Sequence, residues 1–346
     1  MIHRLLLACA LVFAPGLRAG AQQEPAKQDA SSKFTFEQVH FGNIPVELTL
    51  YASNAEQADA AAKAAFARVS ELSAMMNDYA FEPPSPLNLV AAKAPEPVKV
   101  PAELLRALRR AIEMHAITDG AFDVTAKPFV QLWRTSRRIG ELPPKHRLQN
   151  ARRYVQAKAL VLDEDQSTAV LQKQGMWLDL GGLAKGMIGD EVVSLLKQRG
   201  IKSCRYRAGG DMVFGDAPPG QKGWRVTVPD LLVEAEHGKP TTGKPTTGKT
   251  SAGKLSPLSF LAANSAASVS GDVHRFVEID GVRYAHVIDP RTGLGVTERR
   301  VSCVRGPRGI DTDPLATAGL ILDEKAWRAT LAKVAGCRGD LGQITK

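Results

Sequence analysis

A glycine-rich segment with an aspartate and a lysine is the first of several stretches whose residue types could bind a phosphate group. It runs from Asp179 to Gly186 and reads Asp-Leu-Gly-Gly-Leu-Ala-Lys-Gly. Two glycines let the backbone approach a ligand closely, and a helix N-terminus beside a lysine suits a phosphate. The segment follows an apolar run at 176–178, where we expect a strand, and it opens a predicted helix. Its spacing matches neither GxxxxGKS/T nor GxGxxG, and strand–glycine–helix turns also occur without a ligand.

An aspartate and a threonine four residues apart could bind one cation. The sequence Asp313-Pro314-Leu315-Ala316-Thr317 is predicted to open a helix, in which residues i and i+4 share a face. Both side-chain oxygens can then point at one cation, and oxygen ligands suit Mg²⁺. A simpler interpretation stays open, in which Asp313 caps the helix, Pro314 follows in its first turn, and no metal is needed.

A histidine stands near the end of an otherwise apolar strand, three residues before a predicted turn. The turn, from Asp289 to Gly293, reads Asp-Pro-Arg-Thr-Gly, which has the residues that turns favour. Turn chemistry does not account for His286, and a reference pKa of about 6.5 suits a general base. The alternative is a structural histidine. Residues 118–125 follow a predicted helix end, and they either present backbone N–H groups to a ligand or form a tight connection.

The elements that must position these segments mix strands and helices without a regular alternation. Period-two patterns predict strands over 34–50, where Val46, Leu48 and Leu50 alternate with polar residues. Apolar residues at helical spacing predict helices over 55–76, 101–117 and 184–199, and a helix pair within 313–334. Further strands are predicted near 159–163, 168–172, 223–228, 258–263, 273–279, 283–288 and 299–305. This order favours the α+β class over a doubly wound α/β sheet.

The first residues have the pattern of an export signal. Arg4 supplies a positive start, residues 5–14 form a short apolar stretch, and residues 19–21 are small, as at a cleavage site. We therefore expect a signal peptide at 1–21, a disordered linker at 22–32, a domain at 33–346, and a location in the periplasm or cell envelope. The alternatives are an uncleaved N-terminal anchor or a lipid on Cys9, which would be the protein's only attachment to a membrane.

The formal net charge of +9 could indicate a nucleic-acid partner, but its placement argues against one. Arg4 and Arg18 lie in the predicted signal. A repeat within 238–257 adds four lysines and no acid, and we expect it to be a flexible insert. Removing these six cations leaves +3 for the rest of the chain, so we expect no nucleic-acid partner.

Three cysteines remain after the predicted signal, at 204, 303 and 337. Their odd number and wide spacing argue against a disulfide framework or a zinc site. One disulfide after export stays open.

The order of these motifs resembles the ApbE-type FAD:protein FMN transferases over roughly residues 34–335. That family carries TGGAFDxTxxPLxxLW, DLGGIAKGxAxD, GGD, SGDYxRxF, YSHIIDPxTG and ADALATA in this order. The corresponding segments are Thr118–Trp133, Asp179–Asp190, Gly209–Asp211, Ser270–Phe276, Tyr284–Gly293 and Thr312–Ala318. The resemblance implies a two-lobed, T-fold-related α+β domain with FAD in a cleft between the lobes.

The resemblance also implies which residues bind FAD and Mg²⁺. The metal is expected on the backbone carbonyl of Gly182 and the side chains of Asp313 and Thr317. The expected FAD contacts come from the AFD turn, the DLGGxAKG segment, the histidine strand and the N-terminal part, namely Ala121, Phe122, Asp123, Asp179, Lys185, His286, Val287, Ile288, Phe41 and Tyr79. One departure concerns the flavin side, where the family's SELxxLN is shortened to the sequence of residues 85–88, Ser-Pro-Leu-Asn.

The implied reaction transfers FMN to a protein. A Ser or Thr hydroxyl of an exported target, in a DxxSGAT-like sequence, attacks the FMN-side phosphorus of FAD, and AMP leaves. Lys185 neutralises phosphate charge and His286 is the expected base, with Asp289 or Asp272 as an alternative base or as the group that orients the histidine. Family targets are commonly subunits of exported redox complexes.

Two other functions stay open on the sequence. Water could replace the target hydroxyl, which would make the protein an FAD pyrophosphatase that yields FMN and AMP. A flavin-binding protein without turnover is the other alternative. The presence of Lys185, His286, Asp313 and Thr317 argues against it, because binding alone needs no base.

Overall fold

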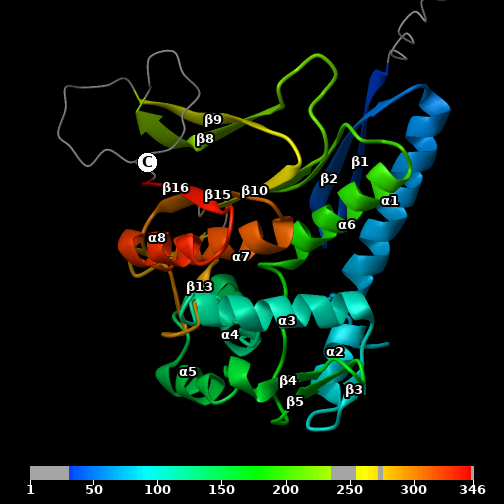
Figure 1. Ribbon diagram of the computed structural model, residues 1–346. Coiled ribbons are helices and arrows are strands. Elements are labelled where there is room, and N and C mark those ends of the chain that lie inside the picture. The colour runs from blue at the N-terminus through cyan, green and yellow to red at the C-terminus, as the bar shows by residue number, and fades with distance from the viewer. Residues whose placement is uncertain (1–30, 235–254, 272–275, 344–346) are drawn as a thin grey trace, which may run out of the picture. The chain divides into compact units, whose positions relative to one another are not determined.

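A seven-stranded antiparallel sheet forms the centre of the computed structural model, which describes residues 31–234, 255–271 and 276–343 (Figure 1). Its strand order is β1-β2-β6-β7-β10-β15-β16. The strands are β1 Ser32–His40, β2 Ile44–Ala52, β6 Cys204–Ala208, β7 Asp211–Phe214, β10 Ser265–Gly271, β15 Arg300–Gly306 and β16 Arg338–Gln343. The predicted alternation is confirmed in β2, where Val46, Leu48 and Leu50 are fully buried.

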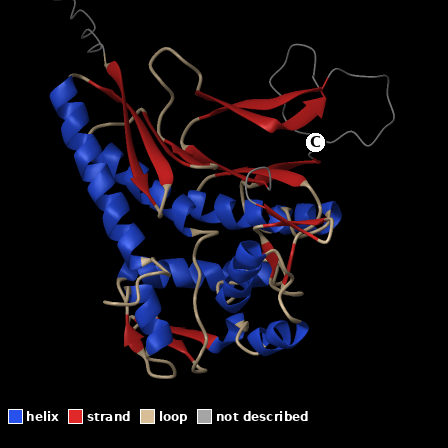
Figure 2. Cartoon of the chain, turned by 180° about the vertical axis from the view of Figure 1, so that it is seen from behind, coloured by secondary structure: helices blue, strands red, loops and turns tan. Residues whose placement is uncertain are grey.

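Four helices lie against one face of this sheet, namely α1 Ala55–Met75, α6 Ala184–Gln198, α7 Gly309–Gly319 and α8 Glu324–Ala332. Helix α1 packs on β1 and β2, α6 on β6 and β7, and α7 on β10 and β15. The alanines on the buried side of α1 bring its backbone close to the strands. A hairpin of β8 Trp224–Glu234 and β9 Leu255–Ala262 covers the opposite face, where Trp224 packs with Phe214 and Ala267 (Figure 2).

A second group of elements lies beyond α7, on the side away from the sheet. Helix α3 packs on α7. The other members are four short helical segments, a small three-stranded sheet and two hairpins, and the bounds are α2 Pro86–Ala92, α3 Ala102–Ile117, α4 Lys127–Ile139, α5 Lys145–Arg152, the 3₁₀ turn Ala157–Ala159, β3 Val98–Lys99, β4 Leu160–Asp163, β5 Thr168–Leu171, β11 Phe276–Ile279, β12 Val282–Ala285, β13 Ile288–Asp289 and β14 Leu294–Gly295. The chain from Ser31 onward is one compact unit, and the predicted α+β class is confirmed.

Helices α6 and α7 are in close backbone contact at a pair of glycines. An ideal Cβ built on Gly186 would lie 2.1 Å from the carbonyl oxygen of Gly309, and one on Gly309 would lie 2.3 Å from that of Gly186. Only glycine fits at either position, because real Cβ atoms do not come so close to a backbone oxygen. The carboxylate of Asp190 on α6 also accepts the N–H groups of Gly309 and Ile310, at 2.7 and 2.9 Å. Helix α6 therefore both packs against α7 and caps its first turn.

Three boundaries differ from the sequence predictions. Helix α7 begins at Gly309 rather than at 313, so Asp313 is not its cap and Pro314 lies inside the helix. The predicted strand at 176–178 is wrong, because these residues belong to no helix or strand. Strand β9 begins at Leu255, so the upper end of the predicted insert 238–257 is wrong, because residues 255–257 pair with β8. The rest of that insert and the predicted signal peptide lie outside the described residues.

Two further observations concern the cysteines and the length of the helices. Cys204, Cys303 and Cys337 are free thiols, so the disulfide left open among them is not formed. Within the described ranges, no helix combines the length and apolar character that a membrane span requires.

The close α6–α7 crossing can be tested with Gly186→Ala. The added methyl group would meet the Gly309 carbonyl, so the helices must separate, and we expect the free energy of unfolding to fall by about 1–3 kcal/mol. Urea unfolding followed by circular dichroism measures this change. The control Ser194→Ala alters an exposed position of the same helix and should change stability by less than about 0.5 kcal/mol. Equal stability of the two variants would contradict the proposed tight crossing.

Candidate functional site

The crossing of α6 and α7 places one lysine between two buried carboxylates. Lys185 Nζ lies 3.1 Å from Asp211 Oδ2 and 3.3 Å from Asp313 Oδ2. Asp211 and Asp313 are 4 % and 3 % exposed, and the backbone N–H of Gly186 also donates to Asp313. Because one ammonium group faces two carboxylates, the cluster of Lys185, Asp211 and Asp313 has an excess of negative charge.

The pKa shifts follow from this charge balance. Burial raises the pKa of Asp313 and the neighbouring Asp211 carboxylate raises it further, against the opposing effect of Lys185. Burial lowers the pKa of Lys185, but the Asp211 and Asp313 carboxylates outweigh it, so the net shift is upward and the lysine stays charged. Asp313 is therefore a carboxylate with too little positive charge around it, and binding of a cation would stabilise its ionised form.

The three predicted metal ligands come together in space. An ideal Cβ on Gly182 would lie 3.4 Å from Thr317 Oγ1, and one on Gly186 would lie 3.1 Å from Asp313 Cβ. Two glycines one turn apart therefore face an aspartate and a threonine one turn apart on α7. A carbonyl, a hydroxyl and a carboxylate form an all-oxygen set, which fits Mg²⁺. Among the described residues there is no cluster of three His, Cys, Asp or Glu residues suited to a metal, so the set depends on its backbone and hydroxyl donors.

The AFD turn (residues 121–123) lies against Gly182, one of the predicted metal ligands. The ring of Phe122 lies 3.3 Å from the ideal Cβ position of Gly182. The turn is held by Phe122 N–H, which donates to Thr118 Oγ1 at 3.0 Å, while Ala121 is buried below it. Asp179 N–H donates to the carbonyl of Val124 at 2.8 Å, which joins the DLGG segment to this turn. Three motifs far apart in the sequence thus converge on Phe122, Gly182 and Thr317.

Two predicted flavin-binding aspartates organise their own loops. Asp179 Oδ1 accepts the N–H of Gly181 at 2.8 Å. Asp123 Oδ1 accepts both the N–H and the hydroxyl of Thr125, at 2.8 and 2.6 Å, and its other oxygen lies 3.3 Å from His115 Nδ1. The backbone groups around these carboxylates are therefore fixed before any ligand binds.

His286 lies between β12 and β13, and its side chain is half-buried. Its neighbours are tied to Val296: the N–H of Ala285 donates to the Val296 carbonyl at 2.7 Å, and the N–H of Val296 donates to the Val287 carbonyl at 3.0 Å. Val287 is half-buried and Ile288 is 8 % exposed. The strand itself ends at Ala285, so the histidine follows the strand rather than belonging to it.

The predicted turn after this histidine is confirmed, and it engages Asp289. The N–H of Gly293 donates to the Asp289 carbonyl at 2.7 Å. Both Asp289 carboxylate oxygens bind the Arg291 guanidinium, at 2.9 Å each. Asp289 is thus better placed to shape the turn than to take a proton. The other alternative base, Asp272, lies outside the described residues.

The hairpin of β13 and β14 directly follows His286, and we call it the histidine hairpin. It is anchored beside the AFD turn. Trp133 Nε1 of α4 donates to the Gly293 carbonyl at 2.8 Å, and Arg152 of α5 donates to the carbonyls of Arg291 and Thr292. Arg291 in turn lies 3.7 Å from the ideal Cβ position of Gly120, at the start of the turn.

Tyr79 and Phe41, the two FAD contacts predicted in the N-terminal part, lie in different surroundings. Tyr79 is 62 % exposed, and the guanidinium of Arg134 lies 4.3 Å from its ring centroid. Burial raises the pKa of Asp78, the residue before Tyr79, and the negative charge of Asp179 raises it further. Phe41 lies in the β1–β2 turn with φ at 50°, beside His40, and packs against the main hydrophobic core, of which Ala121 and Phe122 are members.

The shortened segment at 85–88 has a structural use. Asn88 is buried, and its side-chain amide donates to the carbonyl of Ala80 at 2.8 Å. The ammonium group of Lys127 lies 3.5 Å from both Asn88 Oδ1 and Asp78 Oδ2. These contacts hold the Tyr79 loop against α4, so the shortened segment still supports the loop that carries this predicted contact.

Asp211 is the site residue that sequence reasoning missed. It was part of the GGD motif, but no role could be assigned without knowing that β7 runs beneath α6. Its signal in the sequence is an acid directly after two glycines and before the apolar run Met212–Phe214. In the sequence, Asp190 is likewise only the last residue of a motif, and nothing local indicates that it caps α7.

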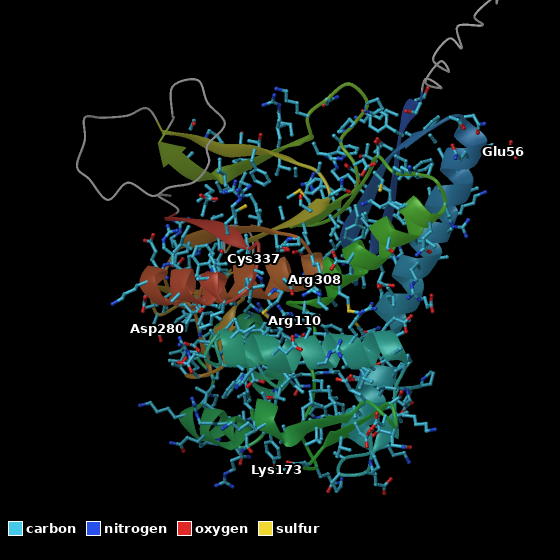
Figure 3. All side chains as sticks on the ribbon, viewed as in Figure 1. Glu56, Arg110, Lys173, Asp280, Arg308 and Cys337 are labelled. Carbon is cyan, nitrogen blue, oxygen red and sulfur yellow. The ribbon has the colours of Figure 1, made fainter. Side chains whose placement is uncertain are left out.

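A cavity of about 590 Å³ lies elsewhere, between α3, α6 and the start of α7. It contains none of the predicted site residues. Its arginines are paired: Arg106 with Glu191, Arg109 with Glu164, and both Arg110 and Arg308 with Asp311. Figure 3 labels Arg110, on α3, and Arg308, just before α7. The convergence of three motifs, rather than cavity size, therefore locates the candidate site.

Comparison with known proteins identifies the family. The model of the ApbE family matches residues 43–338. The chain belongs to the ApbE family. A FAD:protein FMN transferase of Treponema pallidum is 31 % identical over 77 % of this chain and 71 % of its own length, and one of Haemophilus influenzae is 28 % identical over 72 % and 70 %. The predicted family is confirmed, and with it the enzyme class, a transferase.

Solved structures of this family share the fold. The flavin transferase ApbE of Vibrio cholerae superposes with a TM-score of 0.72, at 21 % identity, over 90 % of this chain and 97 % of its own. The flavinyl transferase ApbE of Pseudomonas stutzeri gives 0.71 at 20 % identity, over 88 % and 89 %. At these identities the likeness supports the fold.

The pair between His115 and Asp123 predicts a pH-dependent stability of the AFD turn. The Asp123 carboxylate raises the pKa of His115 above its ordinary value, although burial opposes it. The folded chain therefore holds this proton more tightly than the unfolded chain. The stabilisation is fully present below about pH 6.5 and is lost as the pH rises through the raised pKa. Urea unfolding at several pH values should show this loss in the native protein and not in His115→Gln.

The control for this experiment is His146→Gln, at an exposed position of α5. Its pH profile should follow that of the native protein. If His115→Gln keeps the native pH profile, the pair does not stabilise the turn.

Proposed function

We propose that this ApbE-family chain transfers the FMN half of FAD to a Ser or Thr hydroxyl of an exported protein, with Mg²⁺ bound and AMP released. The observation that carries the proposal is the meeting of Phe122, Gly182 and Thr317 beside the ion pair of Lys185 with the buried Asp313. Curated relatives named FAD:protein FMN transferase support the activity. Export rests on the signal pattern in residues 1–21.

The chain's own groups can bind a pyrophosphate. Lys185 supplies a positive charge in the first turn of α6, where the helix N-terminus also favours anions. A Mg²⁺ ion on Gly182, Asp313 and Thr317 would offset phosphate charge as the reaction proceeds. Phe122 covers Gly182 with an apolar ring, which limits the access of water to that side.

The transfer step needs a base for the acceptor hydroxyl. The hydroxyl oxygen forms a bond to the FMN-side phosphorus, the bond from that phosphorus to the bridging oxygen breaks, and AMP leaves with this oxygen. His286 accepts the hydroxyl proton, because its ordinary pKa suits the task. The ion pair of Asp289 with Arg291 supports this assignment, since both oxygens of the alternative base are engaged.

The decisive experiment supplies purified protein with FAD, Mg²⁺ and a peptide containing a DxxSGAT-like acceptor. We expect fluorescent, flavin-labelled peptide and an equal amount of AMP. Asp313→Asn should lower this activity at least about 100-fold, because the ligand charge is lost, with an unchanged melting temperature. The control Asp59→Asn, on the exposed surface of α1, should keep full activity.

Two outcomes would contradict the proposal. Free FMN and AMP with unlabelled peptide would show hydrolysis, in which water takes the place of the hydroxyl. Full activity in Asp313→Asn would show that the metal binds elsewhere.

The role of His286 predicts a separation of kcat from KM. His286→Gln should lower kcat by about 10²- to 10⁴-fold and change the KM for FAD only slightly, because proton transfer is lost and binding is retained. Steady-state kinetics with varied FAD and saturating peptide measures both constants. Asp289→Asn should affect kcat less. A larger loss of kcat in Asp289→Asn than in His286→Gln would reverse the assignment.

A further inference from the structure

Positive charge is concentrated in one part of the chain. Between Lys127 and Lys158 there are nine lysine and arginine residues and a single glutamate, Glu141, whereas the whole chain has a formal net charge of +9. The modest net charge outside the signal and the insert therefore conceals a strongly basic segment. Most of this segment folds as α4 and α5.

Most of this charge lies on the surface. Lys127 and Arg134 turn inward and pair with Asp78, at 3.5 and 3.7 Å. A group of exposed residues remains, which we call the basic face: Arg138, Lys145, Arg147, Arg153 and Lys158. None of these five forms an ion pair with the described part of the chain. Ile139, which is 54 % exposed, ends α4, and Leu142, 41 % exposed, lies in the link to α5.

The two helices that carry the basic face contact segments of the candidate site. Helix α4 follows the AFD turn within a few residues, and its Trp133 holds the Gly293 carbonyl of the histidine hairpin. Helix α5 is joined to the same hairpin by Arg152. Figure 1 shows α4 and α5 together on the side of β13, below the layer of α7 and α8.

These charges are not needed to hold FAD at the proposed phosphate site. That site has its own cation in Lys185, on α6, paired with Asp211 and Asp313. Like charges at neighbouring exposed positions of two short helices repel each other, so the basic face costs stability unless an anionic partner covers it. A protein acceptor must place polypeptide on the surfaces that border the site, because its hydroxyl has to reach the phosphorus. Exposed apolar side chains beside cations are also typical of protein interfaces.

We propose that the basic face is the docking surface for an acidic segment of the acceptor protein, adjacent to the residue that receives FMN. This inference rests on the proposed transfer function. An electrostatic contact at the edge of an interface mainly speeds association and depends on salt. It should therefore change the KM for the acceptor and leave both kcat and FAD binding unchanged.

The test uses two synthetic peptides with the same DxxSGAT-like acceptor, one flanked by a run of glutamates and one by glutamines. The native protein should use the glutamate peptide with roughly tenfold higher kcat/KM at low ionic strength. The triple variant Arg138→Glu, Arg147→Glu, Arg153→Glu should lose this preference through KM. In about 0.5 M salt the preference of the native protein should also disappear.

A matched control reverses three exposed lysines on other elements, Lys63→Glu, Lys222→Glu and Lys325→Glu. It makes the same change in net charge and should keep the native preference. Equal use of both peptides by the native protein, or an equal loss of preference in the control, would overturn the proposal. A triple variant that keeps the preference but no longer binds phosphatidylglycerol vesicles would also overturn it, in favour of a membrane contact.

Failure of the docking surface and failure of the proposed transfer can be told apart. The glutamine peptide reports transfer alone, so flavin labelling of it by the native protein establishes the reaction. If neither peptide is labelled, the proposed transfer fails. Fluorescence anisotropy of the same peptides then still tests docking, which requires tighter binding of the glutamate peptide by the native protein than by the triple variant.

Discussion

The backbone contact between Gly186 and Gly309 is the constraint on which the rest of the site depends. Each glycine lies where a side chain would overlap the other helix. With the two helices this close, Lys185 on α6 reaches Asp313 on α7, and Gly182 faces Thr317. The same approach lets Asp190 cap α7 through two backbone amides. A wider separation would remove the ion pair, the cap and the predicted metal ligands together.

The charge of the site follows from burial. Helix α7 lies between the central sheet, α6 and α3, so nearly all its residues are buried, including Asp313. A carboxylate in such a place needs compensation, and Lys185 is shared with Asp211. The remaining negative charge favours a cation at this point. A phosphate-bearing substrate would then meet both the cation and Lys185, which is the arrangement that phosphoryl transfer requires.

The elements around this centre perform different tasks. The AFD turn links the predicted metal ligands to the DLGG segment through Phe122 and Val124. Helices α4 and α5 fix the histidine hairpin through Trp133 and Arg152. Their outer surface carries the basic face. The same two helices thus hold the segment that follows the proposed base and also carry the proposed docking surface.

The sequence by itself determined the family, the α+β class and most of the regular elements, because motif order and periodicity are local properties of the chain. It also brought Gly182, Asp313 and Thr317 into one predicted set. Tertiary structure alone decided where α7 begins. The local signal, aspartate before proline, favoured a start at 313, but the cap comes from Asp190 on another helix. The role of Asp211, and which of the cations on α4 and α5 face solvent, were also decided by packing. Which groups face each other depends on neighbours that are distant in sequence, and a net charge averages over surfaces that the fold keeps apart.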